Sequence, residues 1–159
     1  MPKKETIAVL KKRLTRYFNK WIKMRDGSYY DDGSSVACIS CGAIKAINDA
    51  GMHAGHYVNS THTCLRFCEY NVHAQCNTCN LFQRGNLISY REGLCTKITE
   101  EKVKHLELNR HIQIKLSKLW YKEMIDHYKS LVKSNPNKYG KVCFEEACRC
   151  PICDPDRIF

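Results

Sequence analysis

Two short cysteine motifs organise this chain: C-I-S-C from Cys38 to Cys41 and C-N-T-C from Cys76 to Cys79. The pairs are separated by 34 residues, and each pair supplies two thiols from one tight turn. Two C-x-x-C pairs are the usual ligand set of a tetrahedral structural zinc site. We therefore predict that these four cysteines bind one zinc ion, which joins two distant segments of the chain.

The composition favours a single domain in a reducing compartment. The chain has 159 residues, and 43% of them are hydrophobic, which suffices for a modest core that zinc would supplement. Eleven cysteines, an odd number, with C-x-x-C spacing favour metal-binding thiols over disulfides. No apolar signal segment opens the sequence, and no run reaches the length of a membrane helix. We expect a cytoplasmic protein with no membrane-spanning segment.

Positive charge is concentrated near the N-terminus. The formal net charge is +10, and residues 1–25 carry nine Lys or Arg against one acid, Glu5. Apolar residues recur every three or four positions over 5–25, which predicts a helix with one apolar stripe. Its basic remainder is either a polyanion-binding face, with Lys11, Lys12 and Arg16 as candidate phosphate contacts, or a solvated surface. The two interpretations are compatible.

The chain divides into four predicted parts. They are a basic N-terminal helix and turn over 1–35, a zinc-bound module over 36–95, C-terminal helices over 96–135 and a cysteine-rich tail over 136–159. Further elements are expected as strands near 44–47 and 54–58, a helix entered near 76–80, a helix from a Thr99 N-cap to about Leu108, and a helix over roughly 112–133.

The tail contains four more cysteines in the spacing C-x4-C-x-C-x2-C, namely Cys143, Cys148, Cys150 and Cys153. They can form a second zinc site, although the spacing is unfamiliar, or they can be free thiols of a loose tail. The remaining three, Cys64, Cys68 and Cys95, have no evident partners. We expect these three to be small buried apolar residues.

The insert between the cysteine pairs contains groups suited to phosphodiester hydrolysis. Such a reaction needs a base that activates water, a divalent ion that stabilises charge, and cations that hold the backbone. His56, in a Gly-His-Tyr stretch, has the side chain whose pKa suits the base. Asn71 and Asn80 carry amide oxygens, which suit a hard ion such as magnesium, or they can be turn and cap residues. His73 can join the metal or contact phosphate, or simply make a structural hydrogen bond.

This order of residues resembles the His-Asn-His (HNH, ββα-metal) nucleases, and the Cys-x-x-Cys-Asn ending resembles phage endonuclease VII, a Holliday-junction resolvase. A closer resemblance, over roughly residues 5–133, is to the phage NinG/Rap recombination endonucleases. The motifs that carry it are C-I-S-C-G at 38–42, A-G-H-Y at 54–57, L-R-F at 65–67, N-V-H-A-Q-C at 71–76, C-N at 79–80, G-N-L at 85–87 and Y-R at 90–91. The cysteine-rich tail lies outside it.

The resemblance implies an α+β fold with a zinc-stapled ββα-metal (HNH) module flanked by α-helices. It implies a metal-dependent, structure-selective endonuclease that cuts branched recombination DNA, such as a Holliday junction or D-loop. In such a family His56 is the general base, Asn71 orients it, and Asn80 binds the catalytic magnesium or manganese. A phage-encoded member would work in the cytoplasm of the bacterial host, and symmetrical cutting of a junction would favour a homodimer.

The sequence departs from this pattern beside the base. Gly55 stands where such nucleases usually have a metal ligand, and His53 stands where an acid is expected three residues before the base. We expect His53 or Asp49 to complete the metal site, and an imidazole ligand would shift the preference from magnesium towards manganese, nickel or zinc.

Two other functions compete with the nuclease. A non-catalytic zinc-stabilised nucleic-acid-binding module would share the charge and the cysteines but would not need His56 and the two asparagines. A sequence-specific HNH restriction or homing nuclease would need a recognition domain, for which the chain has little room. In each case Arg66, Arg84 and Arg91 are candidate DNA contacts or solvated surface residues.

Overall fold

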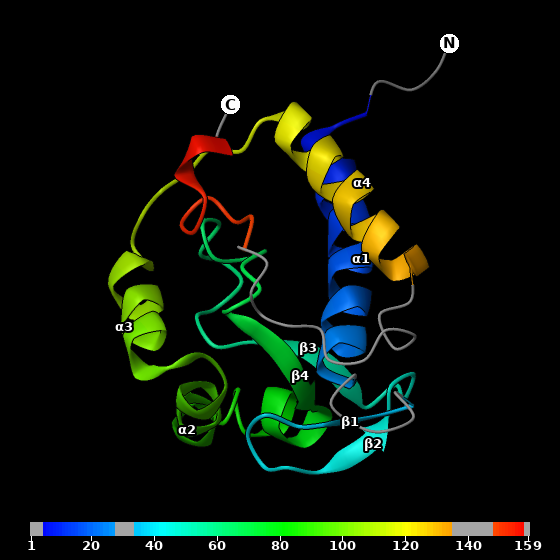
Figure 1. The fold of residues 1–159 in the computed structure, drawn as a ribbon, viewed down its shortest axis with the longest axis vertical. Coiled ribbons are helices and arrows are strands. Elements are labelled where there is room, and N and C mark those ends of the chain that lie inside the picture. The colour runs from blue at the N-terminus through cyan, green and yellow to red at the C-terminus, as the bar shows by residue number, and fades with distance from the viewer. Residues whose placement is uncertain (1–4, 28–33, 135–147, 158–159) are drawn as a thin grey trace.

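The computed structural model describes residues 5–27, 34–134 and 148–157, which form a mixed α+β fold (Figure 1). Two long helices, α1 (Ile7–Gly27) and α4 (Lys118–Ser134), lie side by side and run in the same direction. Phe18 of α1 is fully buried and makes edge-on contacts with Phe67 and Tyr128, at ring-centroid distances of 5.5 and 5.0 Å. The predicted N-terminal helix is confirmed, and its apolar stripe forms the core of the helix pair.

Helix α4 begins several residues after its predicted start at 112. The Ser117 hydroxyl accepts a hydrogen bond from the Trp120 amide at 3.1 Å, which is the signature of an N-cap. Residues 112–117 are not helical, although Leu116 reaches the core. The prediction placed the start of this helix too early, because apolar residues of the non-helical segment 112–117 have the same three- to four-residue spacing as those of the helix.

Two antiparallel strand pairs lie below the helices, as Figure 1 shows. The first pairs β1 (Ser35–Ala37) with β2 (Ile44–Ala46), and the second pairs β3 (Met52–His56) with β4 (Val72–Cys76). A short π-helix, η1 (Thr78–Phe82), follows β4. The strands expected near 44–47 and 54–58 correspond to β2 and β3. Strand β4 was not predicted because all five of its positions are buried, so no alternation of polar and apolar residues marks it.

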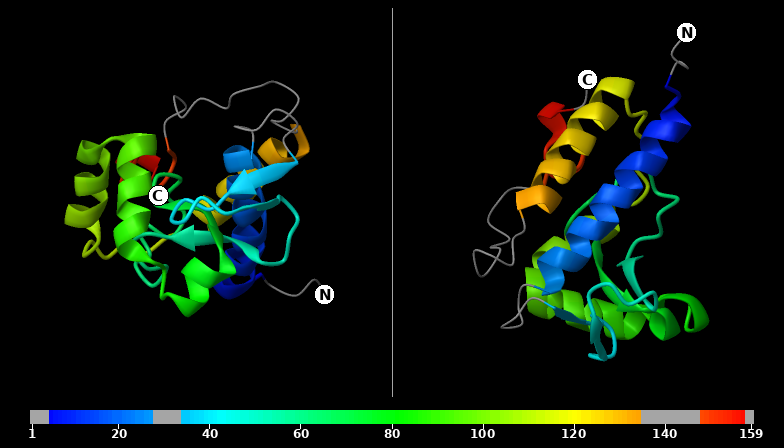
Figure 2. Two further views of the ribbon diagram at one scale, coloured as in Figure 1. Left: turned by 90° about the horizontal axis from the view of Figure 1, so that it is seen from below. Right: turned by 90° about the vertical axis from the view of Figure 1, so that its right-hand side faces the viewer.

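Helices α2 (Leu87–Ile98) and α3 (Glu100–Asn109) pack against the segment that joins β3 to β4, residues 57–71, which we call the 57–71 loop. Helix α2 was not predicted. Arg84, Gly85 and Asn86 have φ values of 50°, 91° and 41° and turn the chain sharply before it. Helix α3 follows Thr99 as predicted, but the Thr99 side chain makes no capping hydrogen bond. The described part of the tail, residues 148–157 with η3 (Pro155–Arg157), lies against the 57–71 loop (Figure 1, Figure 2).

A buried ion pair fixes the end of α1 to β4. Arg25 and Asp26 are only 1% and 2% exposed, and their side chains are 2.8 Å apart. Arg25 also donates to the Val72 carbonyl at 2.8 Å, and Asp26 accepts from the Ala74 amide at 2.6 Å. Arg25 is therefore structural and does not contribute to the basic surface of α1. Among the described residues, no helix combines the length and apolar character needed to cross a membrane.

Candidate metal centres and active site

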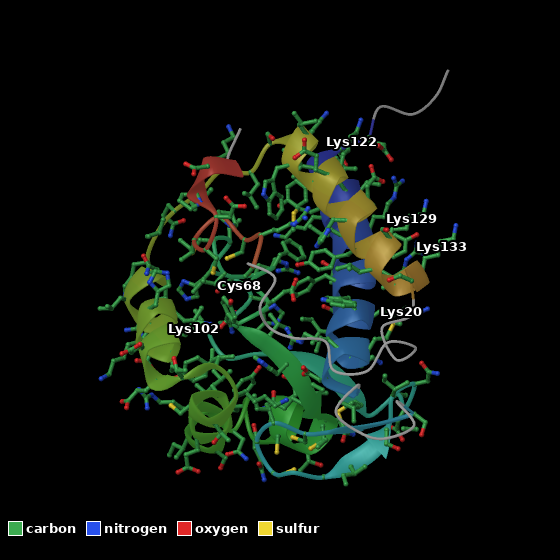
Figure 3. The ribbon with its side chains drawn as sticks, viewed as in Figure 1. Lys20, Cys68, Lys102, Lys122, Lys129 and Lys133 are labelled. Carbon is green, nitrogen blue, oxygen red and sulfur yellow. The ribbon has the colours of Figure 1, made fainter. Side chains whose placement is uncertain are left out.

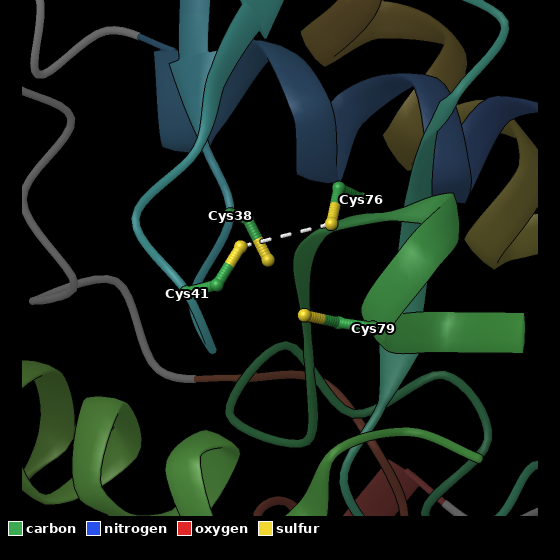
Figure 4. Close-up of side chains that lie close together, drawn as sticks. All are labelled: Cys38, Cys41, Cys76 and Cys79. Carbon is green, nitrogen blue, oxygen red and sulfur yellow. Dashed lines mark hydrogen bonds between the residues drawn. The ribbon is translucent and has the colours of Figure 1, made fainter. Parts of the chain in front are cut away.

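The four cysteines of the two C-x-x-C motifs meet at one point, as predicted (Figure 4). The β1–β2 connection supplies Cys38 and Cys41, the end of β4 supplies Cys76, and η1 supplies Cys79. All four sulfur atoms lie within 4.8 Å of one another, and those of Cys41 and Cys76 are 3.7 Å apart. Zinc–thiolate bonds of about 2.3 Å in a tetrahedron place the sulfurs about 3.8 Å apart. We call this set the frame cluster, and its geometry fits zinc.

A second group of four thiols corrects the sequence prediction. Cys148, Cys150 and Cys153 of the tail meet Cys68 of the 57–71 loop, again with all sulfurs within 4.8 Å. The prediction that Cys68 is an isolated apolar residue is wrong. Cys143, the predicted fourth member, lies outside the described residues. We call this set the tail cluster, and it too can hold zinc. Sequence spacing could not reveal Cys68, because 79 residues separate it from Cys148.

His56 ends β3 and is half-buried at the wall of an open cleft. Its Nε2–H donates to the Arg66 carbonyl at 2.9 Å, so the neutral ring keeps its lone pair on Nδ1. Burial lowers the pKa of His56, and the nearby Arg66 charge lowers it further against the opposing effect of the carbonyl. The ring is therefore neutral, and able to accept a proton, at physiological pH.

Asn71 is fully buried and holds the two ends of the 57–71 loop together. Its Oδ1 accepts from the Val58 amide at 2.7 Å, and its Nδ2 donates to the carbonyls of Val58 and Leu65 at 2.9 and 3.1 Å. Its own carbonyl accepts from the Tyr57 amide, next to His56, at 2.9 Å. This arrangement suits the predicted orienting function.

Asn80, His53 and Asp49 line a smaller hollow of about 460 Å³. The Asn80 amide donates to His53 Nδ1 at 3.0 Å, and His53 Nε2 donates to the Ala50 carbonyl at 3.2 Å. Asp49 is exposed and accepts from the Gly51 amide at 2.6 Å. Within the described chain, only the two cysteine clusters bring three or more His, Cys, Asp or Glu ligand atoms together.

The presence of glycine at position 55, beside His56, has a steric explanation. A Cβ atom at Gly55 would lie 2.8 Å from Cβ of Gln75 and closer still to its side-chain oxygen. Gln75 is fully buried and donates to the Gly85 carbonyl at 2.6 Å and to the Ser40 hydroxyl at 2.8 Å. The space that a metal ligand at position 55 would need is therefore filled by Gln75.

His73 lies in the core, away from the cleft. It pairs with Gly55 across the β3–β4 ladder, is fully buried, and packs edge-on against Tyr90 at 6.3 Å. Burial, and then the Arg25 charge, hold the pKa of His73 well below its usual range. His73 lines neither the cleft at His56 nor the hollow beside Asn80, so the geometry favours the structural alternative over the catalytic one.

The cleft at His56 has a volume of about 990 Å³ and is lined by cationic groups. Arg84 lines it, as do Lys104 and Arg110, which the sequence analysis did not single out. Lys104 and Arg110 lie on and just after α3, far from the motifs, and only the fold brings them to the cleft. Asn80 lines the cleft as well as the smaller hollow.

The other predicted DNA contacts differ in whether their side chains are already bound within the protein or are exposed. Arg91 donates to Glu107 at 2.9 Å, so its charge is already paired. Arg66 donates to the Ser60 carbonyl at 3.0 Å, and its charge lowers the pKa of Lys11, after burial. Lys12 and Arg16 are exposed on α1. The basic surface continues onto α4: Figure 3 shows three of its lysines, Lys122, Lys129 and Lys133, along the same side of the helix pair as Lys20.

Comparison with known proteins places this site in a family. The sequence model of the family described as Bacteriophage Lambda NinG protein matches residues 3–138. The chain belongs to the NinG family. It is 36% identical over 101 residues to protein ninG of Escherichia phage lambda, covering 63% of this chain and 45% of that protein. It is 35% identical over 97 residues to protein ninG of Salmonella phage P22, covering 60% and 43%.

The chain thus spans less than half the length of the NinG proteins that it matches. No solved structure gives a significant match. The matched region ends at residue 138, so it contains the frame cluster and Cys68 but not the three cysteines that the tail contributes.

Proposed function

We propose that this protein is a metal-dependent endonuclease that hydrolyses phosphodiester bonds in branched double-stranded DNA. The observation that carries the proposal is the orientation of His56. Its Nε2–H is bound to the Arg66 carbonyl, which leaves the basic Nδ1 of a ring that lines a cationic cleft. The bond to the Arg66 carbonyl fixes the ring, and the nitrogen that it leaves unprotonated belongs to a residue that lines this cleft.

The proposed reaction starts with a water molecule in this cleft. His56 Nδ1 takes a proton from that water as its oxygen attacks the phosphorus, and the bond to the leaving sugar oxygen breaks. Asn71 holds the 57–71 loop and thereby the Arg66 carbonyl that orients the ring. Arg84, Lys104 and Arg110 line the same cleft and would hold the DNA phosphates.

The divalent ion would be held by Asn80 and His53. When bound, it stabilises negative charge on the phosphate and the leaving oxygen. The two side chains fit such an ion, because their facing atoms are 3.0 Å apart, close to the spacing of neighbouring ligands in an octahedron with bonds of about 2.1 Å. An amide can present its oxygen where its nitrogen lies, so Asn80 can act as a ligand. His53 favours manganese over magnesium.

One observation favours a second candidate, a zinc-stabilised module that binds nucleic acid without cutting it. Among the described residues the cleft contains no group of three His, Cys, Asp or Glu ligand atoms, whereas many nucleases bind their ion with more protein ligands. Both candidate proteins would bind nucleic acid in a basic cleft, and they differ in whether they hydrolyse the bound strand.

The deciding experiment offers labelled four-way junction, flap and linear duplex of the same sequence to the full chain, with manganese, magnesium or chelator. We expect cutting of the branched DNAs with manganese, weaker cutting with magnesium, and none with chelator. Binding without cutting under every divalent ion would establish the second candidate. Equal cutting of duplex and junction would remove the preference for branches.

A further inference from the structure

We propose that the tail cluster binds a second zinc ion, and that this ion locks the 57–71 loop in the conformation that orients His56. The part concerning His56 rests on the proposed function, whereas the metal site does not. Three ligands, Cys148, Cys150 and Cys153, come from a segment outside the matched NinG region, and Cys68 comes from within it. The tail would thus be a metal-bound extension of the nuclease-like module.

The sulfur geometry fits zinc, and all four cysteines of the cluster are free thiols in this structure. The Cys68 sulfur lies 3.7 Å from that of Cys148 and 3.9 Å from that of Cys153. These distances are close to the tetrahedral edge of about 3.8 Å expected for zinc, and almost twice the length of a disulfide bond, which is about 2.05 Å. Three of the thiols are buried, so the site is shielded from water.

The tail also builds the same turn as the frame cluster. In C-I-S-C the Gly42 amide donates to the Cys38 carbonyl at 2.9 Å. In the tail, where the motif reads C-P-I-C, the Asp154 amide donates to the Cys150 carbonyl at 2.9 Å. In both motifs the bond joins the first cysteine to the residue just after the second, which turns two thiols to one side. In addition, the Glu69 amide donates to the Cys148 sulfur at 3.3 Å, as hydrogen bonds around a metal site commonly do.

Cys68 lies in the second half of the 57–71 loop, close to the group that positions His56. Two residues before it, Arg66 provides the carbonyl that binds His56 Nε2. Directly after it, Glu69 joins both long helices: its carboxylate accepts from Tyr128 at 2.9 Å and Trp21 at 3.3 Å. Figure 3 shows Cys68 between the helix pair and Lys102 of α3. An ion on Cys68 would therefore fix the loop two residues after Arg66 and limit movement of the Arg66 carbonyl.

The metal site is tested by counting zinc per chain in purified full-length protein with native mass spectrometry. We expect two ions in the parent, one in Cys68→Ser and one in Cys153→Ser. The matched controls are Cys143→Ser, the ligand that spacing alone suggests, and Cys95→Ser, which belongs to neither cluster; both should keep two ions. One ion in the parent, or loss of an ion in Cys143→Ser but not in Cys68→Ser, would overturn the proposed ligand set.

A measurement on the parent avoids any variant that fails to fold. Brief alkylation of the zinc-loaded chain followed by peptide mapping should leave the eight cluster cysteines unmodified and label Cys95 and Cys143. Labelling of Cys68, Cys148 and Cys150 while the frame cluster stays protected would contradict the second site. Protection of all eight that is lost after mild chelation supports it.

A separate measurement tests whether the ion in the tail cluster orients His56. Cys153→Ser should lower the single-turnover cutting rate about 10- to 100-fold at saturating DNA, while the dissociation constant for DNA stays within about twofold. Cys95→Ser should cut like the parent. A Cys153→Ser protein with one zinc ion and the parental rate would show that the ion does not orient His56. A parent that holds two ions but cuts nothing would refute the nuclease and leave the metal site standing.

Discussion

The β3–β4 hairpin is held at both ends by cysteine clusters, and the two ends differ in what they hold. At the Met52–Cys76 end, the frame cluster joins strands and η1 into one unit. At the His56–Val72 end, the tail cluster joins the 57–71 loop to a distant tail. The first cluster joins elements of the module itself, whereas the second includes Cys68, two residues after the carbonyl that binds His56. With the proposed second zinc ion, one hairpin would separate the stability of the module from the alignment of its site.

The sharpest test of this difference is Cys76→Ser. Binding free energies of structural zinc reach about 10–16 kcal/mol, comparable to or larger than the whole stability of a small domain, about 5–15 kcal/mol. We expect the variant to lose the frame ion and the cooperative fold of the module, seen as loss of zinc and of near-UV circular dichroism. Cys95→Ser is the control. A Cys76→Ser protein that unfolds like the parent would show that the two clusters do not differ in this way.

At the other end of the hairpin, His56→Ala should remove chemistry without unfolding. A positioned base contributes about two to four orders of magnitude in rate, so cutting should fall by 10²- to 10⁴-fold while zinc content and DNA affinity persist. His105→Ala, on the exposed face of α3, is the matched control. Parental cutting by His56→Ala under matched metal would mean that the base lies elsewhere.

The pH profile of the parent gives the same assignment without a variant. The base must be neutral, and burial lowers the pKa of His56 from 6.5. The rate should therefore rise with pH along a limb centred below 6.5 and be level above it. A limb centred above 6.5 would contradict His56 in this environment.

The sequence predicted the Met52–Cys76 end of the hairpin, with its frame cluster, far better than the His56–Val72 end. The C-x-x-C pairs have local spacing that reports a metal site directly, and the stripe of α1 is periodic. Strand β4 carries no pattern because it is buried throughout. Cys68 could not be assigned because its partners are 79 or more residues away. His73 was a candidate for the site as well as for a structural hydrogen bond, and only the fold shows that it is fully buried beside Tyr90.

Between the two ends, Arg25 and Asp26 attach the hairpin to α1. Asp26→Asn should destabilise the protein by about 3 kcal/mol at pH 7, because it takes the nearest carboxylate away from the buried Arg25, at 2.8 Å, and leaves the more distant Glu69 at 3.8 Å. Burial alone would raise the pKa of Asp26, but the charge of Arg25, and then that of Lys97, holds it at about 2, against an ordinary value of 3.8. The stabilisation is thus fully present above about pH 3.8 and is lost as the pH falls towards 2, where zinc thiolates are already protonated.

Urea unfolding at pH 7 is therefore the useful measurement for Asp26→Asn. Asp126→Asn, an exposed acid on α4, is the matched control and should change stability by less than about 0.5 kcal/mol. A change equally small in Asp26→Asn would mean that the clusters alone hold the hairpin in place.

The smallest expected effect concerns the arginines that would contact DNA near the His56–Val72 end of the hairpin. Arg84 lines the cleft and is exposed, whereas the Arg91 guanidinium is bound to Glu107. Neutralising one phosphate contact lowers the slope of log affinity against log salt by about 0.9. We expect that change for Arg84→Gln and a smaller one for Arg91→Gln, measured by fluorescence anisotropy with a four-way junction. Equal changes in the two variants would show that DNA breaks the Arg91–Glu107 pair and reaches across α2, which would extend the contact surface well beyond the cleft.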